Sequence, residues 1–162
     1  MRRWLIKEEP THYAFDDLVR DGATDWSGVK NPTARIHLRA MRAGDLALYY
    51  HSGDVRAAVG IVRIAAGPSP DPSTDAKGVQ VRVRPVAPLA RPVPLSEIRA
   101  DPAFAGFDLL RISRLSVLPL PDRMWRRIEA IARAPPPATA APAGRGRASA
   151  RRRRGPAAPR RR

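Results

Sequence analysis

Short predicted strands separated by turn-length connections constrain the fold of this 162-residue chain more than any other feature. Alternating or clustered apolar and β-branched residues predict five of them, at Arg2–Lys7, Asp45–Tyr50, Ala57–Ile64, Val79–Arg84 and Leu115–Leu118. A doubly wound parallel sheet needs a helical crossover after nearly every strand, and several of these connections are too short for one. The sequence therefore predicts an α+β fold, a small mixed β-barrel with short flanking helices.

Three amphipathic helices are predicted around these strands, at Ala14–Arg20, at Pro32–Met41 and after Asp122. In the second helix Ile36, Leu38 and Met41 are expected to form the buried side. Two proline-rich segments are interpreted as irregular, with Gly67–Asp75 as a surface connection and Pro85–Pro94 as a bend.

The composition changes abruptly after Ala134. Residues 135–162 contain nine Arg, no acidic residue and no large apolar side chain, so they hold nine of the net +15 charges. Such a segment cannot offset the conformational entropy of folding. We therefore expect a folded domain at 1–134 and a disordered Pro/Ala/Arg-rich basic tail at 135–162.

Other compositional features narrow the class of protein. The absence of Cys excludes disulfides and thiolate metal sites, and the three scattered His residues form no metal-ligand motif. No apolar run reaches the roughly 18 residues of a membrane span. We expect a monomer with no cofactor, metal or membrane partner, located in the cytoplasm (bacterial cytosol or nucleoid).

The segment from Asp25 to Ser52 combines an indole, an amide, cations, hydroxyls and an imidazole, which suits a pocket for a flat polar ligand. Trp26, next to Ser27, can stack on a base or plug the end of the barrel. Asn31 can pair with the Watson–Crick edge of a base or cap the helix that follows it. Lys30 and Arg35 suit phosphate, although single basic residues are usually only solvated.

Two further groups complete the candidate pocket. Tyr50, His51 and Ser52 stand at the end of a predicted strand, where side chains can line a pocket mouth. His51 can contact a ligand or serve a structural role. Arg114 and Ser116 are expected on one face of the last predicted strand, which is either a site or a solvated edge.

Catalysis is the main alternative class. His51, Ser52 and Asp54 are the residue types of a hydrolytic triad, but neighbouring positions on a strand and turn cannot easily form the required chain of hydrogen bonds. The sequence contains no nucleophile elbow, Walker loop or H-E-x-x-H motif. We therefore expect that the protein is not an enzyme. Two alternatives stay open: a small hydrolase or nucleotide-processing enzyme that uses the same pocket, and a purely electrostatic DNA-coating protein.

Seven blocks of sequence, in order, resemble the EVE domain family: WLIKEEP (4–10), DWSGVKNPTAR (25–35), GDLALYYHS (44–52), VGIVRI (59–64), PDP (70–72), RPVPLSEIRADP (91–102) and SRLSVLP (113–119). The resemblance covers about residues 2–133. It implies a PUA-like fold and a pocket for a modified base of DNA or RNA, and it favours Trp26, Arg114 and Ser116 as part of that pocket. The tail lies outside the family pattern, and Arg151, Arg152, Arg153 and Arg154 are expected to bind phosphate non-specifically.

Overall fold

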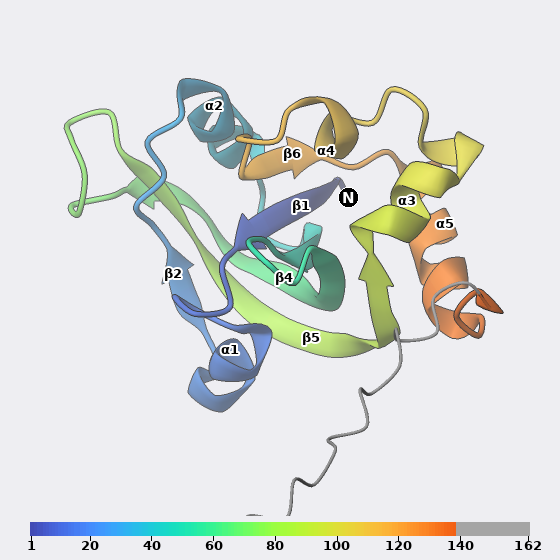
Figure 1. The fold of residues 1–162 in the computed structure, drawn as a ribbon. Coiled ribbons are helices and arrows are strands. Elements are labelled where there is room, and N and C mark those ends of the chain that lie inside the picture. The colour runs from blue at the N-terminus through green and yellow to red at the C-terminus, as the bar shows by residue number, and fades with distance from the viewer. Residues whose placement is uncertain (139–162) are drawn as a thin grey trace, which may run out of the picture.

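The computed structural model describes residues 1–138, and within that range six β-strands form one curled mixed sheet (Figure 1). The strands are β1 (Arg3–Glu8), β2 (Thr24–Trp26), β3 (Leu46–His51), β4 (Ala57–Pro70), β5 (Val79–Pro94) and β6 (Val117–Pro119). Their order across the sheet is β2-β5-β4-β3-β1-β6, and β1 and β3 run parallel. The sheet curls into an incompletely closed barrel, which confirms the predicted α+β mixed-barrel architecture.

Short helices flank this sheet. They are α1 (Phe15–Asp21), α2 (Pro32–Ala40), α3 (Leu95–Ala100), a 3-10 turn (Pro102–Phe104), α4 (Asp108–Arg111) and α5 (Asp122–Arg133). The apolar stripe predicted for the last helix is confirmed, since Met124, Trp125 and Ile128 are buried. In the part of the chain that is described, none of the helices is long and apolar enough to cross a membrane.

β4 and β5 extend much further than their patterns predict. The expected surface connection at Gly67–Asp75 is wrong at its start, because β4 continues to Pro70, and the expected bend at Pro85–Pro94 is strand. Proline has no N–H for the ladder, yet the pairing of β4 with β5 persists because the register shifts at four places along it. These irregularities let a proline-rich strand curve around the barrel.

The buried side of α2 also differs from the prediction. Leu38 and Met41 are buried as predicted, but Ile36 is 61% exposed, and Ala34 and Arg35 are buried beside Leu38. These three residues lie on one face of a helix at i, i+1 and i+4, whereas Ile36 points away from it. The charged Arg35 is thus buried on the inner face of the helix, whereas the aliphatic Ile36 is exposed.

The pairing of β1 with its neighbours brings polar strand ends to one edge of the sheet. β1 and β3 are parallel and in register, so Glu8 lies opposite His51, and the N–H of Ser52 donates to the Glu8 carbonyl at 3.0 Å. β6 runs antiparallel to β1, and the N–H of Lys7 donates to the Ser116 carbonyl at 2.9 Å. The end of β1, the end of β3 and the turn before β6 therefore meet.

The last strand is shorter than predicted. It begins at Val117 rather than Leu115, so residues 113–116 form a turn that precedes it. Arg114 and Ser116 therefore do not share a strand face as expected. The basic tail predicted at 135–162 lies, from residue 139 onward, outside the described residues, and so do Arg151, Arg152, Arg153 and Arg154.

Candidate functional site

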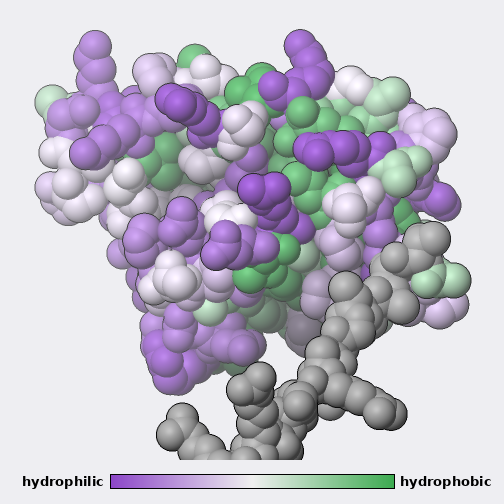
Figure 2. Space-filling view, viewed as in Figure 1, coloured by the Kyte–Doolittle hydropathy of each residue, from purple (hydrophilic) through white to green (hydrophobic). Residues whose placement is uncertain are grey.

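A cleft of about 340 Å³ opens at the edge where these strand ends meet. Its walls are the end of β1 with the segment after it, the loop between β2 and α2, the residue after β3 and the turn before β6. The lining residues are Lys7, Glu8, Glu9, His12, Trp26, Ser27, Gly28, Val29, Lys30, Ser52, Ser113, Arg114, Leu115 and Ser116. Figure 2 shows that this face is largely hydrophilic over β2 and α1, with apolar residues gathered over β6 and α4.

Six of the residues predicted for the site line this cleft: Trp26, Ser27, Lys30, Ser52, Arg114 and Ser116. They come from three separate segments of the chain, and the fold alone brings them together. Their contacts with a ligand stay predictions.

Trp26 belongs both to the core and to the wall of the cleft. It is only 6% exposed, and its ring meets the Tyr49 ring edge to face, with centroids 5.5 Å apart. Such a pair adds to the energy of burial. Trp26 therefore plugs the end of the barrel, and the remaining exposed part of its indole belongs to the cleft wall.

Three predicted pocket residues lie outside the lining of the cleft. The side-chain oxygen of Asn31 accepts the N–H of Ala34 at 3.0 Å, so this residue caps α2. Tyr50 is buried at 3% exposure. Nε2 of His51 accepts the N–H of Phe15 at 3.1 Å, and burial lowers the pKa of His51 despite the opposing charge of Asp16.

Arg35 is not available for phosphate, contrary to expectation. Its Nε donates to the Val29 carbonyl at 2.8 Å, and Nη1 and Nη2 each donate to the Asp75 carboxylate at 3.1 Å. The guanidinium is buried and its donors are directed at protein acceptors. Arg35 therefore fixes the loop between β2 and α2 instead of facing a ligand.

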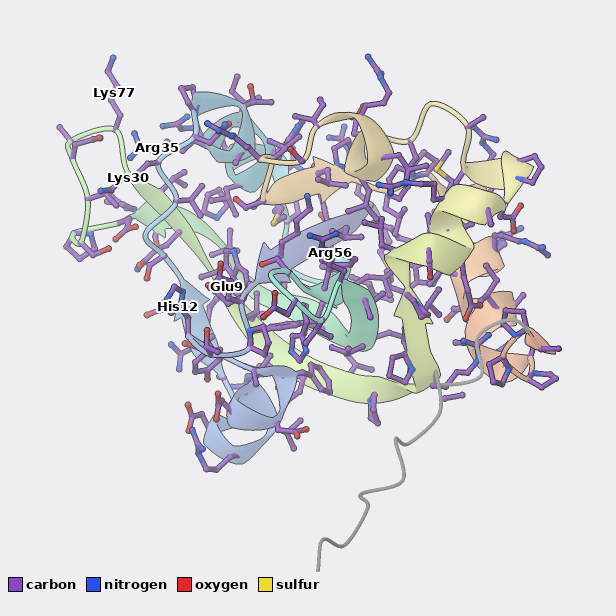
Figure 3. All side chains as sticks on the ribbon, in the orientation of Figure 1. Glu9, His12, Lys30, Arg35, Arg56 and Lys77 are labelled. Carbon is purple, nitrogen blue, oxygen red and sulfur yellow. The ribbon has the colours of Figure 1, made fainter. Side chains whose placement is uncertain are left out.

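The sequence pattern did not indicate the charged wall that β1 and the following segment supply. Nζ of Lys7 donates to the Ser113 carbonyl at 3.2 Å, and burial lowers the pKa of this ammonium. Oε1 of Glu8 accepts the N–H of Glu9 at 2.9 Å and lies 3.5 Å from Nδ1 of His12. Figure 3 shows Glu9 and His12 beside the end of β1. The only hint in the sequence was the WLIKEEP block, which contains Lys7, Glu8 and Glu9.

A buried carboxylate outside the cleft holds the loop that carries its central residues. Asp71 is 3% exposed; its Oδ2 accepts the N–H of Gly28 at 2.7 Å, and its Oδ1 accepts the N–H and Oγ–H of Ser73. Burial raises the pKa of Asp71, but these hydrogen bonds and the charge of Arg35 outweigh it and lower the pKa. Gly28 has φ = 74°, a left-handed conformation that favours glycine.

An incompletely closed mixed barrel, with a polar cleft at the meeting point of its strand ends, defines a PUA-like domain. The EVE domain model matches residues 2–131, and the chain belongs to the EVE domain family. Among its relatives is thymocyte nuclear protein 1 of chicken (Gallus gallus), 34% identical over 72% of this chain and 63% of that protein. This chain thus spans less than two thirds of the chicken protein.

Solved structures show the same fold. A protein from Agrobacterium tumefaciens superposes with a TM-score of 0.79 at 32% identity, covering 82% of this chain and 93% of that one. Human thymocyte nuclear protein 1 in complex with DNA containing 5-methylcytosine superposes with a TM-score of 0.79 at 26% identity, covering 84% of this chain and all of that one. An EVE-domain protein therefore binds DNA.

Proposed function

We propose that this protein is a non-enzymatic nucleic-acid reader that takes an extruded, modified base into the cleft. The observation that carries the proposal is the convergence of an indole edge, hydroxyls, cations and carboxylates in one recess, in a fold shared with a DNA-bound relative. Extruding a base from a duplex costs a few kcal/mol, and less in a single strand or at a damaged pair. DNA carrying 5-methylcytosine is the first candidate ligand, and RNA remains part of the proposal.

The charges of the cleft favour a base with an exocyclic amino group. Carboxylates such as those of Glu8 and Glu9 accept hydrogen bonds from the N4 amino group of cytosine, whereas thymine presents a carbonyl at the equivalent position. The cations Lys30 and Arg114 on the other walls can donate hydrogen bonds to phosphate or carbonyl oxygens. This arrangement supports a preference for cytosine-type bases over thymine.

The position of His51 argues against a hydrolase in this cleft. Its Nε2 is occupied as acceptor of the Phe15 N–H, so the imidazole is directed at α1 and not at Ser52. A triad of His51, Ser52 and Asp54 would need that nitrogen as the general base.

The basic tail, with nine Arg and no acidic residue, is proposed to add affinity without selectivity.

Binding to a panel of oligonucleotides tests the proposal. Oligonucleotides of one sequence carry cytosine, 5-methylcytosine or thymine at the central position, and affinities are measured by fluorescence anisotropy. We expect the wild type to bind the 5-methylcytosine form most tightly and the thymine form least. Equal affinity for all three would refute base reading.

A matched pair of variants ties the preference to the cleft. Arg114→Gln changes a lining residue, whereas Arg111→Gln removes the same charge from exposed α4 outside the lining. We expect Arg114→Gln to reduce the preference for the modified base and Arg111→Gln to leave it unchanged. A preference that survives Arg114→Gln would exclude this residue from readout and leave it as a phosphate contact.

A further inference from the structure

A second recess, lined by cations, adjoins the residues that connect β4 to β5. We call residues 71–78 the tip loop. Two hollows of about 280 and 470 Å³ lie between the tip loop, the end of α2 and the end of β4, and both are lined by Arg39 and Pro68. We call these two hollows together the tip groove. Its other lining residues are Met41, Arg42, Ala43, Gly67, Ser69, Pro70, Ala76, Lys77, Gly78 and Val79.

The charge of the tip groove is one-sided. Arg39, Arg42 and Lys77 line it and are exposed, and among the described residues no carboxylate does. The two carboxylates of the tip loop are engaged within the domain: Asp71 binds Gly28 and Ser73. Asp75 binds the guanidinium of Arg35 and also accepts the N–H of Lys77 at 2.9 Å. The neighbouring carboxylate of Asp45 is buried against Trp4 and backbone N–H groups. The lining of the tip groove therefore carries a net positive charge, which suits a polyanion.

One of the three cations of the tip groove, Arg39, is tied to the tip loop. Nη2 of Arg39 donates to the Lys77 carbonyl at 2.6 Å, which ties the end of α2 to the tip loop. Pro68 and Pro70 form part of the wall, and proline fixes its own φ angle. Less conformational entropy is therefore lost when a ligand orders this surface.

The tip loop connects the tip groove to the cleft. Its Asp71 binds the N–H of Gly28, and its Asp75 binds Arg35, which also donates to the carbonyl of Val29. Gly28 and Val29 line the cleft, so the loop that supplies Ala76, Lys77 and Gly78 to the tip groove is also attached to a wall of the cleft. Figure 3 shows Lys77, Arg35 and Lys30 following one another along the same edge of the molecule.

We propose that the tip groove binds the phosphodiester backbone of the nucleic acid whose base occupies the cleft. This inference rests on the proposed function for its ligand, but it adds a second contact surface that the sequence did not indicate. Arg39, Arg42 and Lys77 neutralise phosphates outside the target nucleotide, while the cleft selects the base. Phosphate contacts of this kind position the nucleic acid and carry no sequence information.

A triple substitution with a matched control tests the proposal on the full chain. Arg39→Gln, Arg42→Gln and Lys77→Gln are combined in one variant, because all three side chains are exposed. The control combines Arg123→Gln, Arg126→Gln and Arg133→Gln, which removes the same charge from exposed positions of α5, on the opposite side of the molecule from the tip loop (Figure 1). Affinity for a single-stranded oligonucleotide carrying 5-methylcytosine is measured over a range of salt concentrations.

The expected result is specific to the tip-groove variant. Loss of three phosphate contacts should reduce the slope of log K against log salt by about 2 in a single strand, since each contact contributes about 0.7. The ratio of affinities for modified and unmodified oligonucleotides should be unchanged, and so should binding of the free 5-methylcytosine nucleoside, which has no phosphate. The control should change the slope by much less.

Two outcomes would overturn the proposal. Equal loss of slope in both variants would show that only net charge matters, and an unchanged affinity in the tip-groove variant would show that the groove does not contact the phosphodiester backbone. Failure of the proposed function gives a different result. The wild type would then show no base preference, while the salt slopes of the two variants would still report on the groove.

Discussion

Asp71→Asn should destabilise the domain and loosen the loop between β2 and α2, which we call the cleft loop. Asp71 itself lies outside the cleft. The carboxylate accepts three hydrogen bonds, from the N–H of Gly28 at 2.7 Å and from the N–H and Oγ–H of Ser73 at 2.8 and 2.6 Å. Asn has the same shape but only one acceptor oxygen. Whichever way its amide is turned, its NH₂ group faces a backbone N–H that loses its acceptor.

The magnitude follows from the burial of the site. A hydrogen bond to a charged group contributes about 1.5–3 kcal/mol, and an orphaned buried donor costs about 1–3 kcal/mol. Because Asp71 is 3% exposed, water cannot replace the lost acceptor. We expect a loss of about 2–4 kcal/mol in the free energy of unfolding. For a domain of this size that corresponds to a decrease in Tm of about 7–14 °C.

Asp25→Asn is the matched control. Asp25 pairs with Arg82 at 2.9 Å on β2, directly before the cleft loop, but both side chains are 47% exposed. An exposed pair of this kind contributes about 0–1 kcal/mol. Thermal unfolding followed by circular dichroism compares the two variants, and hydrogen exchange at the Gly28 amide reports on the loop itself. Equal Tm values for the two variants, or unchanged exchange at Gly28 in Asp71→Asn, would refute the role given to this carboxylate.

Two further predictions concern the surroundings of Phe15. Gly60→Ala should lower the free energy of unfolding, measured in urea, by about 1–3 kcal/mol, because a Cβ there would lie 2.5 Å from ring carbons of Phe15. Gly67→Ala is the control and should be nearly neutral, since a Cβ there would meet no atom within 4 Å. His51 accepts a hydrogen bond in its neutral form and burial lowers its pKa in the folded state, so its contribution to stability should be complete above the ordinary pKa of about 6.5 and decline as the pH falls from there towards the folded value. Urea unfolding between pH 7 and pH 5 should show this decline, and a His51→Gln variant with an equally steep decline would contradict it.

Local patterns predicted the elements whose signals lie within a few residues. The apolar stripe of α5, for example, follows from helical spacing alone. The lengths of β4 and β5 were not predictable in this way. Proline lowers the strand propensity of a segment, and only pairing with a distant strand, through several register shifts, compensates for the missing donors.

The candidate site divides along the same line. The residue types of the cleft loop and the resemblance to the EVE domain family were sufficient to predict a polar pocket containing Trp26 and Ser27. The tertiary structure decided which residues line the cleft, because the parallel pairing of β1 with β3 brings Glu8 to the edge where Ser52 lies. Side chains with equivalent chemistry in the sequence therefore differ in role.

Arg35 and Lys30 are both cations of one short segment, and the sequence by itself determined only that they carry charge. The fold buries Arg35 between Val29 and Asp75 and leaves Lys30 exposed at the cleft. The reason is physical: a side chain's role depends on which partners the rest of the chain places within hydrogen-bonding distance. For Arg35 the charged partner, Asp75, is 40 residues away in the sequence, beyond the range of any local pattern.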